Sequence, residues 1–511
     1  MENNQANTKR IAKNTLMLYV RMLFSMLVSL YTSRVVLSTL GVEDYGIYNV
    51  VGGVVAMFSL LSGSLSAAVS RFLTFELGKN DRQRLSKVFS TSLVVHIFFA
   101  IFIVVAIETI GVWFLNNKMV IPEERMFAAN WLLQFSTFSF LVALISVPYN
   151  ASIVSHEKMA VFAYIGITDT LLRLFVVLSL SWYPTSWDKL IVYALLLLLV
   201  SLFFQGVYWY YCVHHFPECR FQLNFDNSLL KEIMGFAGWN FIGASSAVLR
   251  DQGGNILLNL FGGPSVNAAR GLANSVNVAV GGFVGNFMAA VRPQITKSYA
   301  AGDYEYMMSL INRSSRFSFY LLFLLSLPIL LNTHYVLSLW LGDVPNHVEL
   351  FVQLILIFAM CESVSNPLVT AMLATGKIRN YQIVVGGLQM MNLPISYVTL
   401  KMGAIPESVI LVAIGLSLCC LLARLVMLKG LINLSINGYL KNVIGNVVLV
   451  VLIGAIIPVL SVSATDNFFV FCIESLICLI SSSLSIFYLG CTVGERHFIS
   501  EKGKKIIDKI K

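Results

Sequence analysis

The residues of this sequence that are best suited to chemistry are arginines inside long apolar segments. Burying a charge in apolar surroundings costs free energy unless the charge meets water, a partner or a ligand. Eight arginines but only five acidic residues lie in these segments. This excess indicates a cationic interior that suits an anionic ligand. The eight arginines are Arg21, Arg34, Arg71, Arg173, Arg250, Arg270, Arg292 and Arg424, and the five acids are Glu108, Asp169, Asp251, Glu362 and Glu474.

The composition identifies the surroundings of these charges as a membrane. Of the 511 residues, 57% are hydrophobic and only 12% are charged, whereas a soluble domain is usually about 25% charged. Continuous apolar runs such as IVYALLLLLVSLFF exclude a transmembrane barrel, whose strands alternate apolar and polar residues. We attribute the net charge of +9 to cytoplasmic loops rather than to nucleic-acid binding. Scattered cysteines and histidines show no metal-ligand spacing, so we expect no metal.

Apolar segments long enough to span a bilayer recur along the whole chain. With the N-terminus inside, the inner loops carry 23 basic residues and the outer loops four, which predicts that both termini are cytoplasmic. The fourteen segments are 13–39, 46–75, 88–115, 124–153, 159–182, 188–213, 229–260, 266–296, 314–340, 347–374, 379–401, 407–430, 440–462 and 467–492.

The chain also repeats itself. Residues 67–81 are similar to 289–303, and residues 148–158 are similar to 367–377. Pro148 and Pro367 are 219 residues apart, and Arg71 and Arg292 are 221 apart. A shift of six helices preserves orientation, so we predict two parallel six-helix repeats, with helix bends at Pro148 and Pro367. The predicted divisions are an N-terminal lobe 1–213, a cytoplasmic linker 214–228, a C-terminal lobe 229–434, an appended helix pair 435–493 and a basic cytoplasmic tail 494–511.

The first and seventh to eighth predicted helices supply the candidate site. We predict that Arg21, Arg34, Arg250 and Arg270 form a cationic substrate-binding cavity. Arg71 and Arg292 are further candidates for the cavity or for a gate. They lie near cytoplasmic helix ends, where a long side chain can also reach the membrane surface, so a substrate role and a surface position both stay open.

Other polar residues at membrane depth are candidates for the cavity or for a gate. Asp169 and Arg173 are four residues apart, a spacing that favours a helical ion pair. Asp251 follows Arg250 directly, so we expect the two side chains to diverge rather than neutralise each other. Asn255 and Asn274, beside Arg250 and Arg270, favour a watery lumen over interhelical hydrogen bonds alone.

Together with the segments AAVSRF, AAVRPQ and YGIYNVVGG at 45–53, the division into six, six and two helices resembles a known family. It is the polysaccharide-transporter branch of the multidrug/oligosaccharidyl-lipid/polysaccharide (MOP) exporter superfamily, within which the chain is most similar to O-antigen and capsular-polysaccharide flippases. The resemblance implies a MATE-like all-α membrane fold, with two lobes in a V. It implies a flippase of lipopolysaccharide and related polysaccharide biosynthesis that carries undecaprenyl-pyrophosphate-linked oligosaccharide across the bacterial inner membrane by alternating access.

Partners and cofactors follow from the same resemblance. The expected partners are the lipid-linked oligosaccharide, membrane lipid, and a polysaccharide polymerase with other assembly proteins. We expect no cofactor, while coupling to H⁺ or Na⁺ stays open.

Two other functions fit the sequence less well. A drug efflux antiporter of the same superfamily would need acids for cation coupling, and here the arginines outnumber them. A membrane polymerase or ligase would need a sizeable outer loop with catalytic groups, whereas loops such as GVED at 41–44 are short. The chain also lacks a phosphate-binding GxxxxGK[ST] loop. A transporter is therefore expected, not an enzyme.

Overall fold

The computed structural model describes residues 2–56, 58–117, 119, 121–182, 188–222, 226–461, 467–497 and 500–501. Nearly all of these residues are helical, and none of them lies in a strand. Most of the predicted basic tail, and residues 223–225 of the predicted linker, lie outside the described residues. The all-α membrane fold predicted from the sequence is confirmed.

Nearly all described residues of the fourteen predicted segments are helical. Eleven stretches among the described residues are long and apolar enough to cross a membrane by length and composition. The predicted second helix and the two arms of α8 are not among the eleven, and the predicted second helix is divided between the end of α1 at Ala56 and the start of α2 at Ser59. Many large apolar side chains are exposed, including Phe98, Leu452 and Leu460, as expected where a helix faces lipid.

Two very long helices each contain a sharp turn. The helix α1 (Glu2–Ala56) has non-helical geometry at Gly41, and α8 (Asn227–Ala300) has it at Gly263. Both glycines have a positive φ, 84° and 76°, which a residue with a Cβ atom rarely adopts. Each long helix is therefore two consecutive arms joined by a glycine turn.

Contacts divide the chain into two units. Unit 1 is Met1–Ala244 with Thr296–Gly302, and unit 2 is Ser245–Ile295 with Asp303–Lys511. The sequence-based division at 214–228 and the V-shaped arrangement of lobes stay predictions.

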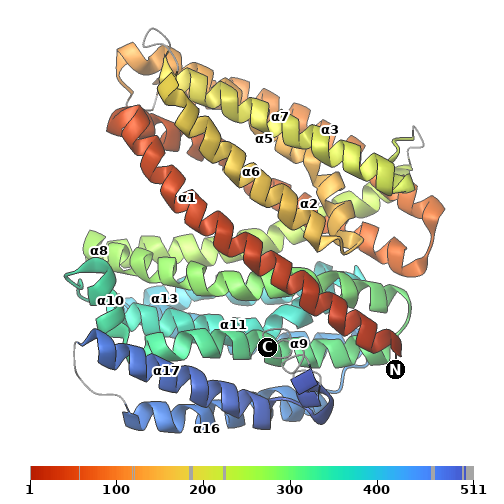
Figure 1. The fold of residues 1–511 in the computed structure, drawn as a ribbon, viewed down its shortest axis with the longest axis vertical. Helices are drawn as coiled ribbons and strands as arrows, with labels where there is room; N and C mark the ends of the chain where they lie inside the picture. The colour runs from red at the N-terminus through yellow and green to blue at the C-terminus, as the bar shows by residue number, and fades with distance from the viewer. Residues whose placement is uncertain are drawn as a thin grey trace, which may run out of the picture. The chain divides into compact units, whose positions relative to one another are not determined.

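In unit 1, α5 packs against α7 and α3, and α1 packs against α6; α3, α5 and α7 lie side by side in Figure 1. Its core includes Val51, Ile103, Leu132 and Leu190, which are almost fully buried. The elements of this unit after α1 are α2 (Ser59–Lys79), α3 (Arg82–Ala106), η1 (Ile107–Gly111), α4 (Val112–Asn117), η2 (Glu123–Arg125), α5 (Met126–Ser155), α6 (Met159–Ser179), η3 (Leu180–Trp182), α7 (Lys189–His215) and η4 (Pro217–Cys219).

In unit 2, α11 packs between α9 and α14, and the neighbouring helices α16 and α17 pack on α9 (Figure 1). Its elements beyond α8 are α9 (Tyr304–Leu331), α10 (Thr333–Leu341), α11 (Val348–Thr375), α12 (Arg379–Met390), α13 (Asn392–Lys401), α14 (Ser408–Ile432), α15 (Ile436–Tyr439), η5 (Leu440–Gly445), α16 (Asn446–Ser461), α17 (Phe468–Ser485) and η6 (Ile486–Gly490).

The internal repeat is visible in the backbone. Positive φ angles recur at Gly41 and Gly263, at Asn80 and Gly302, and at Glu157 and Gly376. The first two pairs are 222 residues apart and the third is 219 apart. The side chains of Asp81 and Asp303 each accept a hydrogen bond from the backbone at the start of the next helix. Turns and caps therefore repeat together with the sequence.

Candidate functional site

A polar cavity of about 310 Å³ lies within unit 2 and brings together most of the predicted site residues of that unit. Both arms of α8 line it, facing α11, α13 and α14. Because Gly263 reverses the chain between the two arms, residues near 250 and residues near 270 can face one space. The lining residues are Arg250, Asp251, Gln252, Asn255, Arg270, Gly271, Asn274, Asn277, Ile355, Phe358, Asn392, Val409, Ile410 and Ala413.

Arg250 and Asp251 form an ion pair, which corrects the expectation that their side chains diverge. Nε of Arg250 lies 3.0 Å from Oδ1 of Asp251, and the guanidinium carbon lies 5.1 Å from the ring centroid of Phe358. The Cβ atoms do point apart, but the long arginine side chain reaches back to its neighbour. The pair leaves the Asp251 side chain 56% exposed and the Arg250 side chain only 14% exposed.

Arg270 is the less neutralised of the two cavity arginines. Its Nη1 atom is buried and has no hydrogen-bond partner among the described residues. The guanidinium lies against Gly254, where a Cβ atom would be only 2.6 Å from Nη1. With two arginines and one aspartate, the cavity carries one net positive charge.

Amide side chains supply the remaining polar lining. Nδ2 of Asn255 donates to Oε1 of Gln252 at 3.1 Å, while Asn274 and Asn277 come from the other arm of α8. Asn392 of α13 is almost fully buried and accepts a hydrogen bond from Ser396 at 3.3 Å. Amides both donate and accept, so this lining suits hydroxyl groups as well as anions.

The structure adds lining residues that sequence reasoning missed, among them Gln252, Phe358 and Asn392. Gln252 and Asn392 are polar residues inside apolar segments, the same signal that singled out the arginines, and could have been found by it. Phe358 carries no such signal, because an apolar residue in an apolar segment is indistinguishable from a lipid-facing one.

Arg21 lies in unit 1 and has a similar setting. Its guanidinium carbon is 4.3 Å from the ring centroid of Phe162, and a Cβ atom at Gly166 would lie 2.8 Å from its Nε. In both units an intramembrane arginine thus occupies the space that a glycine of a neighbouring helix arm leaves open. The side chain of Arg34 lies outside the described part of the structure.

The other candidates fall outside the unit 2 cavity. Arg71 lies among aromatic rings, with Phe72 and Phe75 each 4.6 Å from its guanidinium carbon, and Arg292 does not line the cavity. The predicted ion pair of Asp169 and Arg173 is confirmed at 3.0 Å. Pro148 and Pro367 are buried inside α5 and α11, and the bends there stay predictions.

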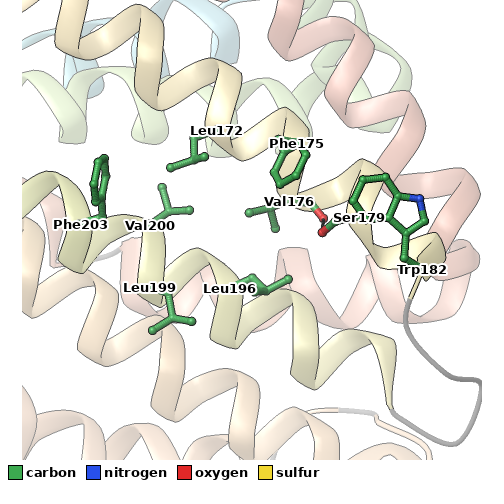
Figure 2. Close-up of a pocket in the computed structure, with 9 residues that line it drawn as sticks. All are labelled: Leu172, Phe175, Val176, Ser179, Trp182, Leu196, Leu199, Val200 and Phe203. Carbon is green, nitrogen blue, oxygen red and sulfur yellow. Dashed lines mark hydrogen bonds between the residues drawn. The ribbon is translucent and has the colours of Figure 1, made fainter.

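A second cavity, of about 410 Å³, lies in unit 1 between α6 and α7. Figure 2 shows its lining, in which Ser179 and Trp182 carry the only polar side-chain atoms. Several of its aromatic side chains are exposed, among them Phe175 and Phe203. The described lining suits hydrocarbon and contains no charged side chain.

Comparison with known proteins adds the following likenesses. A family model described as polysaccharide biosynthesis protein matches residues 11–299. The uncharacterized membrane protein EpsK of Bacillus subtilis (strain 168) is 21% identical over 328 residues, which are 63% of this chain and 63% of EpsK.

Solved structures of MATE transporters share the fold. The complex of MATE with MaD3S has a TM-score of 0.72 at 12% identity, covering 84% of this chain and 97% of that one. An outward-facing multidrug resistance MATE family transporter of the MOP superfamily has a TM-score of 0.71 at 12% identity, covering 84% and 96%. A MOP superfamily transporter from Pyrococcus furiosus Vc1, described by the reverse polarity of its binding pocket, has a TM-score of 0.69 at 12% identity, covering 84% and 96%.

Proposed function

Because the chain belongs to the polysaccharide biosynthesis protein family, we propose that it translocates undecaprenyl-pyrophosphate-linked oligosaccharide across the bacterial inner membrane. It is a multi-pass membrane protein with the fold of MATE transporters, and a flippase uses such a fold without chemical conversion of its cargo. The repeat units would serve O-antigen, capsule or another exopolysaccharide.

The observation that carries this proposal is the buried Nη1 of Arg270, which has no hydrogen-bond partner among the described residues and lies in a cavity whose described lining has one net positive charge. A guanidinium donates parallel hydrogen bonds to phosphate oxygens, so a pyrophosphate would satisfy the group that the described residues leave open. Arg250 would provide the second positive charge, partly balanced by Asp251 in the absence of cargo.

The sugar and lipid parts of the cargo have different requirements. Asn255, Asn274 and Asn277 offer donors and acceptors to sugar hydroxyls. The polyprenyl tail needs no polar site and stays in the bilayer. The transporter would alternate between inward-facing and outward-facing states, a mechanism typical of proteins built from repeats.

A drug antiporter is the competing function within the same superfamily. Two arginines against one carboxylate in the cavity repel a cationic drug, because unscreened like charges at short range are unfavourable. The cavity charge therefore favours an anionic cargo.

The test is transport by the purified protein in liposomes with a fluorescent polyprenyl-pyrophosphate oligosaccharide. Arg270→Ala is expected to lower the transport rate at least tenfold, since a hydrogen bond to a charged group contributes about 1.5–3 kcal/mol. Arg270→Lys should retain part of the transport rate, because the positive charge remains while the paired N–H donors of the guanidinium are lost.

The matched control is Lys429→Ala, which removes an exposed basic residue near the end of α14 that does not line this cavity. It should transport nearly as well as the wild type. Wild-type rates in Arg270→Ala, with equal protein in the liposomes, would contradict the proposed role of the cavity.

A further inference from the structure

A second charged cavity, of about 620 Å³, lies in unit 2 at the ends of helices, apart from the cavity that contains Arg270. It is formed where α9 meets η5, the start of α16 and the chain after η6. The predicted topology puts this end of the helices on the cytoplasmic side. Its lining residues are Ser309, Asn312, Arg313, Arg316, Lys441, Asn442, Gly445, Asn446, Leu449, Thr492 and Glu495.

The floor of this cavity is a buried ion pair. Arg316 is 8% exposed, and its Nη2 donates to Oε1 of Glu495 at 3.0 Å. Its Nη1 donates to the carbonyl oxygen of Gly490 at 2.9 Å. Glu495 also accepts from the backbone N–H of Thr492 at 2.8 Å and lies 3.4 Å from Nε of Arg313. Several donors therefore share one carboxylate.

Positive charge remains after this pairing. Among the described lining residues, Arg313, Arg316 and Lys441 carry positive charge and Glu495 is the single carboxylate, which leaves two net positive charges. Nε of Arg316 is buried and has no hydrogen-bond partner in the described part of the chain. The amides of Asn312 and Asn442 and the hydroxyl of Ser309 add neutral donors. Such a lining suits a phosphate group.

One edge of the cavity is apolar. Leu449 belongs to the lining, and it is followed along α16 by exposed side chains including Leu452. A charged pocket that continues into an apolar helix face matches an amphiphile, with its phosphate in the pocket and its acyl chain along the helix. A free phosphate ion would contact only the charged pocket and not the apolar helix face.

We propose that this cavity binds the phosphate head group of an anionic phospholipid of the inner leaflet. Basic pockets between membrane helices on the cytoplasmic side are suited to such head groups. The bound lipid would join α9 to the appended pair α16 and α17, because Arg313 lies on α9 while Lys441 lies in η5, which leads into α16. The site is independent of the proposed transport function.

The test is thermal unfolding of the full-length protein in an uncharged detergent, titrated with phosphatidylglycerol, phosphatidylcholine or inorganic phosphate. Phosphatidylglycerol is expected to raise the apparent melting temperature saturably, while the other two leave it unchanged. In Lys441→Glu, and in Arg313→Gln with Lys441→Gln, at least ten times more phosphatidylglycerol should be needed. Lys441 is exposed on the structure, so its substitution spares the buried ion pair.

The matched control is Lys377→Glu, a charge reversal at an exposed lysine between α11 and α12. It should keep the wild-type titration curve. Equal stabilisation by inorganic phosphate would overturn the assignment to a lipid. An unchanged curve in Lys441→Glu, or an equal loss in Lys377→Glu, would overturn the assignment to this cavity.

Discussion

Arg270 and Gly254 fit together so closely that a Cβ atom on Gly254 would lie 2.6 Å from Nη1 of the arginine. The guanidinium occupies space that only a glycine provides, between the two arms of one long helix. Arg21 and Gly166 have the same relationship in unit 1, where the Cβ atom would lie 2.8 Å from Nε. In both units a glycine leaves space for an intramembrane arginine, and this space determines where the guanidinium lies.

Gly254→Ala is expected to lower transport several-fold without lowering stability. The added methyl group displaces the flexible end of Arg270, whereas alanine in a helix is about 0.5–1 kcal/mol more favourable than glycine. Gly271→Ala is the matched control, since it lines the same cavity but a Cβ atom there meets nothing within 4 Å. The transport rate and the apparent melting temperature are measured for both variants. Equal transport rates would show that the space left by Gly254 does not position Arg270 for transport.

Asp251→Asn is expected to tighten binding of a short polyprenyl pyrophosphate several-fold. Removing the carboxylate frees Arg250 from its 3.0 Å ion pair and raises the net charge of the cavity, and a nearby charge acts strongly where water is scarce. Binding is measured by titration in detergent. Glu305→Gln, at an exposed position on α9, should bind like the wild type. Unchanged or weaker binding by Asp251→Asn would mean that the cavity does not hold the anion.

Arg125→Ala is expected to destabilise unit 1 by about 1–3 kcal/mol. The Arg125 guanidinium donates to Asp44 of the second arm of α1 at 2.6 Å and to Asp188, the residue before α7, at 2.6 Å. Without it, two carboxylates, each roughly three-quarters buried or more, lose their shared partner. The apparent melting temperature should fall, and less so in Arg125→Lys. Lys189→Ala changes a neighbouring basic residue and should have little effect.

Glu218→Gln is expected to weaken the dependence of stability on pH in acid. Burial of the Glu218 carboxyl raises its pKa, but the hydrogen bond with His156 and neighbouring charges outweigh this, so the net pKa lies below its ordinary value of 4.5. A lowered pKa stabilises the folded state above pH 4.5, and that contribution is lost as the pH falls through the folded-state pKa.

The measurement for Glu218, in η4 after α7, is the apparent melting temperature from pH 7 down to pH 3.5. The wild type should lose stability below pH 4.5 more steeply than Glu218→Gln, while the variant is less stable at pH 7. His156 also stacks on Phe216, with ring centroids 4.1 Å apart, so the loop should stay ordered in the variant. Parallel curves for both proteins would show that Glu218 does not contribute in this way.

Local patterns were enough to predict much of this fold. The apolar segments coincide with helices because the length and hydropathy of a membrane helix are set by consecutive residues. The repeat offset reappears as paired positive-φ turns at 41 and 263 and at 157 and 376. The ion pair of Asp169 and Arg173 follows from helix geometry alone, since residues four apart lie on one face.

The tertiary structure decided what the cavity contains. Phe358, Asn392 and Arg270 come from three different helices, and Arg270 and Asn392 are 122 residues apart along the chain, so no local pattern predicts their meeting. The Arg250–Asp251 pair likewise depends on a side-chain bend that Cβ directions do not reveal. The sequence by itself determined that arginines lie at membrane depth in repeated helices, because that is a property of neighbouring residues. Only the tertiary structure decided that Nη1 of Arg270 has no hydrogen-bond partner among the described residues, because pairing depends on side chains that distant segments bring together.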